Sequence, residues 1–195
     1  MKQTSFSRKP RLFYGLATSL AFATLLALTG LAQPPPPGAA AEAPVPGGKV
    51  VDFNTLLPLL PEPPAAWKAE PAEGSTDDLG DAQITTVHRD YTQGDGDNVP
   101  TTSISILDSA SNPEYVEATT AGWTSNTSDA EGYTKSLRID GMPGFETFEN
   151  DGKHGMLWLL VAKRYFLQIE TTAQDAKELQ EWLKRIDLKK LAEIK

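Results

Sequence analysis

Apolar and polar residues alternate along several stretches of the chain, a pattern typical of strands with one buried face. It predicts strands over residues 67–69, 84–91, 101–107, 133–140, 145–149 and 165–171. Residues 156–162 are apolar at every position, so we expect a central strand covered on both faces. The polar residues 72–81 and 94–98 are expected to form turns and the polar residues 125–131 a loop, and Asp151-Gly152 is a strong hairpin signal.

Apolar residues at helical spacing predict helices between and after these strands. Asp52 is a suitable N-cap for residues 53–60, and Pro61 ends that segment. Asn112-Pro113-Glu114 begins a second helix, because asparagine caps well and proline suits the first turn. Residues 176–186 and 188–194 close the chain with further helical spacing.

The order of these elements predicts an α+β domain. We expect an antiparallel sheet of about six or seven strands, because consecutive strands are joined by short turns. The fully apolar strand needs cover on both sides, so helices should lie on both faces, giving an α–β–α sandwich.

This layout resembles the Mog1/PsbP-like fold, including exported bacterial domains of unknown function in that group. The features that carry the resemblance are the amphipathic segment 53–60 with Pro61 and Trp67, the helix from Asn112 after strand 101–107, and the strands around turn 141–144 with a closing helix. The resemblance covers residues 50–195 and implies binding of a small ligand or protein partner rather than catalysis. No family motif is matched, so no functional residue is carried over.

The N-terminus has the pattern of an export signal. Lys2, Arg8, Lys9 and Arg11 precede an apolar run over residues 12–32. We therefore expect export to the periplasm or the extracellular space, with residues 1–32 acting as a signal peptide. At roughly 20 residues the run could also span a bilayer, which leaves an uncleaved N-terminal anchor as the alternative. A lipoprotein is excluded, since the chain has no cysteine.

Residues 33–48 are mostly proline, alanine and glycine and include a run of prolines at 34–37. Such a composition favours extended polyproline II, so we interpret this segment as a semi-rigid linker. A proline-rich ligand for a partner is the alternative. The remaining residues, 49–195, are expected to form a single α+β domain.

Charge is distributed unevenly along the chain. The net charge is −8, yet residues 62–151 hold 18 acidic and 4 basic residues, whereas residues 152–195 hold 9 basic and 6 acidic ones. This acidic body argues against binding to nucleic acid or to an anionic membrane surface. It is compatible with cationic ligands or divalent ions.

Few residues suggest catalysis. The absence of cysteine excludes disulfides and thiol chemistry, and the only histidines are His88 and His154. There is no nucleophile elbow, Walker loop or dinucleotide fingerprint. Asp95, Asp97 and Asn98 offer oxygen ligands in one loop, but Val99 stands where an EF-hand needs its third ligand. We assign no catalytic, cofactor-binding or metal-ligating residue and expect no cofactor.

The sequence therefore predicts an exported, non-enzymatic domain that binds a protein partner or small ligand in the cell envelope. One alternative is a hydrolase using His88 or His154, which needs the imidazole in a cleft beside a hydroxyl or carboxylate. A second alternative is an acidic cation-binding module at Asp95–Asn98. Trp123 and Tyr115 are expected either to line a ligand groove or to pack on the sheet. The oligomeric state stays open.

Overall fold

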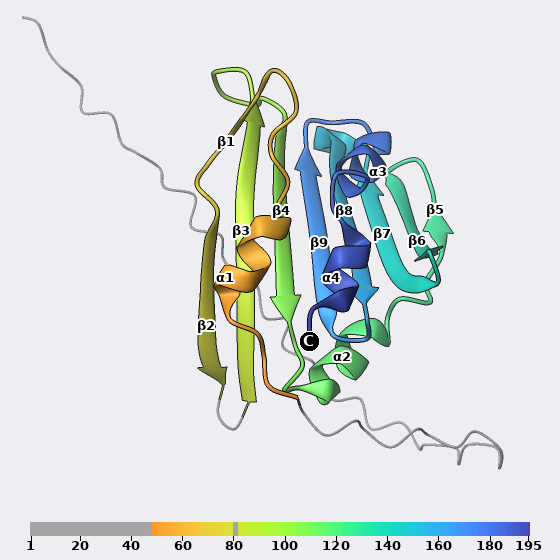
Figure 1. Ribbon diagram of the computed structural model, residues 1–195. Coiled ribbons are helices and arrows are strands. Elements are labelled where there is room, and N and C mark those ends of the chain that lie inside the picture. The colour runs from red at the N-terminus through yellow and green to blue at the C-terminus, as the bar shows by residue number, and fades with distance from the viewer. Residues whose placement is uncertain (1–47, 80–81) are drawn as a thin grey trace, which may run out of the picture. The chain divides into compact units, whose positions relative to one another are not determined.

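Figure 1 shows the computed structural model, which describes residues 48–79 and 82–195. These residues belong to one compact unit. The expected export signal, residues 1–32, and all but the last residue of the expected linker, residues 33–48, lie outside the described residues. In the described part of the chain, no helix has the length and apolar character needed to cross a membrane.

The described residues form one nine-stranded sheet and a few short helices, which confirms the α+β class. Its strands are β1 Trp67–Ala69, β2 Glu73–Leu79, β3 Ala82–Gln93, β4 Thr101–Asp108, β5 Thr127–Ser128, β6 Gly132–Ile139, β7 Met142–Glu149, β8 His154–Val161 and β9 Tyr165–Thr172. They are ordered β1-β3-β4-β9-β8-β7-β6-β5, and β2 also pairs with β3. Every pairing is antiparallel.

The helical segments are α1 Phe53–Leu56, η1 Leu57–Leu59, α2 Pro113–Thr120, η2 Asp151–Lys153, α3 Lys177–Leu183 and α4 Leu188–Glu193. The expected caps are present. The Asp52 carboxylate accepts a hydrogen bond from the Asn54 amide at 2.8 Å, and the Asn112 side chain accepts one from the Tyr115 amide at 3.0 Å. Each cap satisfies an amide that has no partner inside its helix.

Most of the core lies between the sheet and α1, α3 and α4, on a side that we call the helical face. Figure 1 shows α1 and α4 in front of the sheet on this side. The sheet contributes alternate residues of its central strands, α3 contributes three buried residues, and α1 and α4 contribute one each. The fully buried members include Ile104, Ile106, Leu157, Leu159, Leu167 and Ile169 from the strands and Leu56, Leu179 and Leu191 from the helices.

The opposite face has a thinner cover. Only α2 and the residues after it pack there in the described part of the chain, where Tyr115 and Trp123 contact Phe166. Because α2 has only eight residues, it reaches one end of the sheet. Helices thus lie on both faces, but the second layer of the expected sandwich is partial.

Three expectations about individual segments were wrong. The turn expected over residues 141–144 is shorter, because β7 already begins at Met142. Residues 72–81, expected as a polar turn, contain β2, and the expected loop around Thr127 contains β5. Both strands lie at sheet edges, where backbone pairing suffices and side chains can stay polar. The alternation pattern cannot detect such strands, which is why the sheet has nine strands rather than six or seven.

Candidate functional site

The face of the sheet opposite α1, α3 and α4 stays partly accessible to solvent, and we call it the open face. Along β4 and β8, buried residues alternate with half-buried ones, so one side of each strand is covered and the other is not. The cross-strand register shows which residues of the neighbouring strands lie on the same side as the half-buried residues of β4 and β8. Its residues include Glu73, His88, Asp90, Ser103, Ser105, Phe145, Thr147, Glu149, His154, Met156, Trp158, Gln168 and Glu170.

The centre of the open face is apolar. Trp158 lies between Phe145 on β7 and Gln168 on β9, and its indole Nε1 donates to the Met156 sulfur at 2.8 Å. The Trp158 ring also meets Phe166 edge to face, with centroids 6.3 Å apart. Trp158, Met156 and Phe145 are each half-buried, so this centre is held in place while part of it faces solvent. The expectation that residues 156–162 are covered on both faces therefore holds only near α2.

Trp123 and Tyr115 belong to the packing between α2 and the sheet. Their rings meet Phe166 edge to face, with centroid distances of 5.9 and 5.5 Å. Trp123 is only 9% exposed. Of the two roles expected for these side chains, the structure places them in the packing.

The charged residues of the open face are mostly acidic. Glu73, Asp90, Glu149 and Glu170 lie on it, and the register adds Asp77 at the edge. Two basic side chains face the same side. Arg138 on β6 donates from its guanidinium to the Gly141 carbonyl at 3.0 Å, and Lys68 on β1 lies at the far edge. The face is therefore an apolar patch surrounded by carboxylates and hydroxyls.

Both histidines lie on the open face, and each is paired with a carboxylate. His154 Nε2 is 2.9 Å from Glu170 Oε1, and His88 Nε2 is 3.9 Å from Glu73 Oε2. Their side chains are 34% and 46% exposed. Among the described residues, neither imidazole has a hydroxyl as hydrogen-bond partner, and neither lines a pocket named below. A carboxylate–imidazole pair alone lacks the nucleophile that hydrolysis needs.

A pocket of about 760 Å³ lies at the β5–β6–β7 end of the sheet. Its lining includes Thr134, Thr147 and Glu149, which the register places on the open face. The loops at its rim add three more carboxylates, those of Asp129, Glu131 and Asp151. The pocket lining contains no lysine or arginine, so the acidic character of the open face continues into it.

A buried carboxylate on the helical face was not expected. Glu146 is 1% exposed, and its Oε1 accepts from the Tyr133 hydroxyl at 2.5 Å and lies 2.7 Å from the Lys135 ammonium. Its Oε2 accepts from Gln180 of α3 at 2.7 Å. Burial, and then the contact with Glu146, raise the pKa of Tyr133, so its hydroxyl stays protonated. With donors on both oxygens, this cluster joins β6 and β7 to α3.

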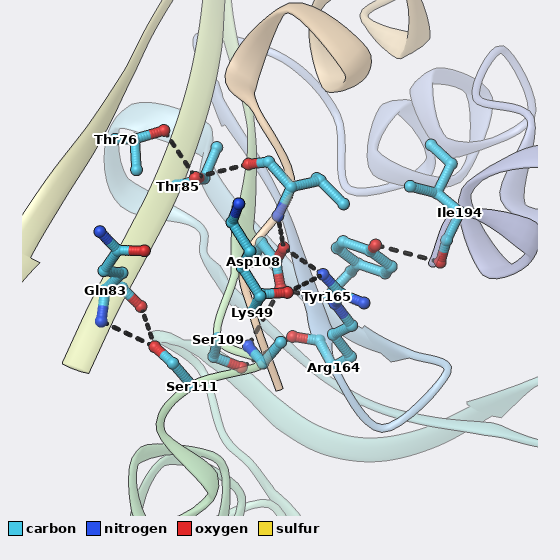
Figure 2. Close-up of polar contacts among 12 residues, drawn as sticks. Lys49, Thr76, Gln83, Thr85, Asp108, Ser109, Ser111, Arg164, Tyr165 and Ile194 are labelled. Carbon is cyan, nitrogen blue, oxygen red and sulfur yellow. Dashed lines mark hydrogen bonds and ion pairs between the residues drawn. The ribbon is translucent and has the colours of Figure 1, made fainter. Parts of the chain in front are cut away.

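A second buried carboxylate lies where the domain begins (Figure 2). Asp108 is fully buried, and both its oxygens accept from the Arg164 guanidinium at 2.7 Å. It also accepts from the amides of Val51 and Ala110, at 2.8 and 3.0 Å. The bond to Asp108 raises the pKa of Arg164, which stays charged. A second pocket, about 780 Å³, is lined by Lys49, Val51 and Arg164 beside this pair.

The loop proposed as a cation site contains an ordinary surface ion pair. Asp95 Oδ1 lies 2.6 Å from the Lys68 ammonium, and this contact lowers the pKa of the exposed Asp95 carboxyl. Over residues 48–79 and 82–195, no group of three or more histidine, aspartate or glutamate side chains could hold a metal ion. Asp97 and Asn98 are exposed and do not complete a site with Asp95.

Sequence reasoning missed Glu146 and Asp108 because their partners come from distant segments. A weak signal was present for Glu146, which lies on the same side of β7 as the buried residues Gly144 and Phe148. Comparison of the chain with protein-family models, with curated proteins and with solved structures found no match.

Proposed function

We propose that this chain is an exported, non-enzymatic binding domain of Mog1/PsbP-like fold, which docks a protein partner in the cell envelope through its open face. One observation carries the proposal. A half-buried apolar centre of Trp158, Met156 and Phe145 lies on a sheet face that no described helix covers beyond α2. Interfaces have this organisation, with aromatic and methionine side chains at the centre and a polar rim.

The breadth of the open face favours a protein over a small ligand. Small-molecule sites are concave and enclose most of the ligand surface. The open face instead extends across the neighbouring strands β3, β4, β9, β8 and β7, and beyond them to β2 and β6. It presents hydroxyls such as those of Ser103 and Ser105 around the apolar centre. A broad surface of this kind suits a partner that contributes its own complementary surface.

The remaining polar groups support binding rather than catalysis. The buried carboxylates of Asp108 and Glu146 have donors on both oxygens, so neither is poised to take a proton from a substrate. Each histidine faces a glutamate. The signal pattern of residues 1–32 and the linker over residues 33–48 support a position outside the cytoplasm.

Site-specific photocrosslinking tests the docking proposal. A photoreactive amino acid would replace Ser105 or Gln168 on the open face of the full chain, expressed in cells of its own source. Matched positions on the helical side are Lys184 and Glu193, which are exposed. We expect a discrete protein adduct from Ser105 and Gln168 after illumination, lost when Trp158 is also changed to alanine. Equal adducts from Lys184 and Glu193, or none from the open face, would overturn the proposal.

A further inference from the structure

We infer that the partner segment docked on the open face is basic, a stretch rich in lysine or arginine. This inference rests on the proposed function and adds the chemistry of the partner to it. Its basis is the combination of an apolar centre with carboxylates placed around it on several strands.

The first argument is charge complementarity. Glu73, Asp90, Glu170 and Glu149 lie on β2, β3, β9 and β7, so negative charge extends across the whole width of the face. Among lysines and arginines, the register of the described strands places two on this side, Arg138 on β6 and Lys68 on β1, and the Lys68 ammonium is already paired with the Asp95 carboxylate at 2.6 Å. Opposite charges at an interface favour encounter with the matching partner and repel an acidic one.

The second argument is the spacing of the carboxylates. A single metal ion needs several ligands that converge on one point, and the described carboxylates form no such group. Charges spread over separate strands instead match a partner that carries several separate cations. The pocket of about 760 Å³ continues this arrangement with Glu149 shared between it and the open face, and with Glu131 and Asp151 at its rim.

The third argument is the position of Trp158. Glu170 pairs across the strands with Met156 and is therefore the diagonal neighbour of Trp158. Diagonal side chains on a sheet are roughly 7–8 Å apart at their Cα atoms, within the reach of one long side chain. A lysine or arginine of the partner can lay its stem on the accessible part of the indole while its charge meets the Glu170 carboxylate.

The test uses a defined peptide probe. A fluorescein-labelled twelve-residue peptide of alternating lysine and serine would be titrated with the purified full chain in a neutral detergent, and anisotropy would report binding. The same peptide with glutamate in place of lysine is the first control. We expect binding of the lysine peptide only, weakened by added salt, because the contacts are ionic and solvent-exposed.

Two triple variants with equal charge changes decide the location. One combines Glu149→Gln, Asp151→Asn and Glu170→Gln on the open face and its pocket. The other combines Glu178→Gln, Glu181→Gln and Glu193→Gln on α3 and α4. We expect the first to weaken binding about tenfold or more and the second less than about threefold, since a specific contact exceeds the effect of net charge.

Circular dichroism of both triple variants checks that they fold alike. Equal weakening by the two variants, or equal binding of the glutamate peptide, would overturn the inference. The inference and the proposed function can fail separately. Suppose that Ser105 and Gln168 give crosslinks, but that the open-face triple variant binds the lysine peptide as well as the unchanged chain does. Docking on the open face would then stand, and the inference of a basic partner would be rejected.

Discussion

Asp108 and Arg164 meet through two parallel hydrogen bonds of 2.7 Å, although they are 56 residues apart in the chain. Asp108 ends β4, and Arg164 lies in the turn between β8 and β9. The same carboxylate accepts the Val51 amide, so one buried charge joins three segments. Because burying a charge is costly unless it is paired, this contact makes the three segments depend on one another.

Removing that charge should destabilise the domain. In Asp108→Asn the Arg164 guanidinium loses its anionic partner in a site where Arg164 is only 19% exposed. We expect the free energy of unfolding to fall by about 3 kcal/mol, measured by urea denaturation. Asp95→Asn is the matched control, because the ion pair of Asp95 with Lys68 is exposed on both sides. An equal loss in both variants would contradict the role of burial.

Replacing one buried threonine should stabilise the domain. The Thr171 hydroxyl is fully buried and has no hydrogen-bond partner among the described residues. Thr171→Val keeps the shape of the side chain and removes this unpaired hydroxyl. We therefore expect the free energy of unfolding, measured by thermal or urea denaturation, to rise by about 1 kcal/mol.

Thr85→Val provides the opposite case. The Thr85 hydroxyl is equally buried, but it donates to the Val51 carbonyl at 2.7 Å and meets the Thr76 hydroxyl at 2.8 Å. Thr85→Val should therefore lower the free energy of unfolding by about 1–2 kcal/mol. Changes of the same sign in the two variants would argue against a difference in hydrogen bonding.

The domain should lose stability in alkali. Burial raises the pKa of Tyr91 and of Tyr165 to about 12, from an ordinary value of 10.0. A raised pKa in the folded state means that folding favours the neutral form of each tyrosine. The contribution of the two neutral hydroxyls to the free energy of unfolding is therefore complete below pH 10 and is lost as the pH approaches 12. Urea midpoints measured across this range, with phenolate absorbance as a second signal, should fall together. Ionisation of both tyrosines near pH 10 without unfolding would refute this.

A residue that favours the left-handed backbone conformation should stabilise the turn between β8 and β9. Ala162 and Lys163 have φ values of 53° and 54°. This is the left-handed region of backbone conformation, which glycine and asparagine adopt more readily than other residues do. The turn is closed by the Arg164 amide, which donates to the Val161 carbonyl at 3.0 Å. We expect Ala162→Asn to raise the unfolding free energy by about 0.5 kcal/mol and Ala162→Val to lower it by about 1 kcal/mol. Equal midpoints for the two variants would show that this strain is absent.

The sequence predicted those parts of the fold that depend on neighbouring residues. The caps at Asp52 and Asn112 and the strands with alternating apolar residues are local patterns, and the structure confirms them. The edge strand β2 was missed because its pairing with β3 comes from backbone groups, while its side chains, such as Ser75 and Asp77, are exposed. The sequence of such a strand looks like that of a polar turn, and only the backbone pairing with a neighbouring strand distinguishes the two.

The open face could not be predicted for a related reason. Residues 156–162 are apolar throughout, which normally indicates cover on both sides. Met156 and Trp158 stay half-buried because α2, with eight residues, ends before it covers them. The buried Glu146 depended on Gln180, which lies 34 residues further along the chain. Contacts at such separations follow from the assembled sheet and not from local spacing.

The contacts around Asp108 also determine how the domain would respond to tension. Gly48 donates to the Ala110 carbonyl, Lys49 accepts from Arg164, and Val51 donates to Asp108, all before the first helix begins. A pull applied at Gly48 would meet these three bonds before it reached α1. Force would thus pass first to the end of β4 and to the β8–β9 turn, and would load the helices over the core only after these bonds had broken.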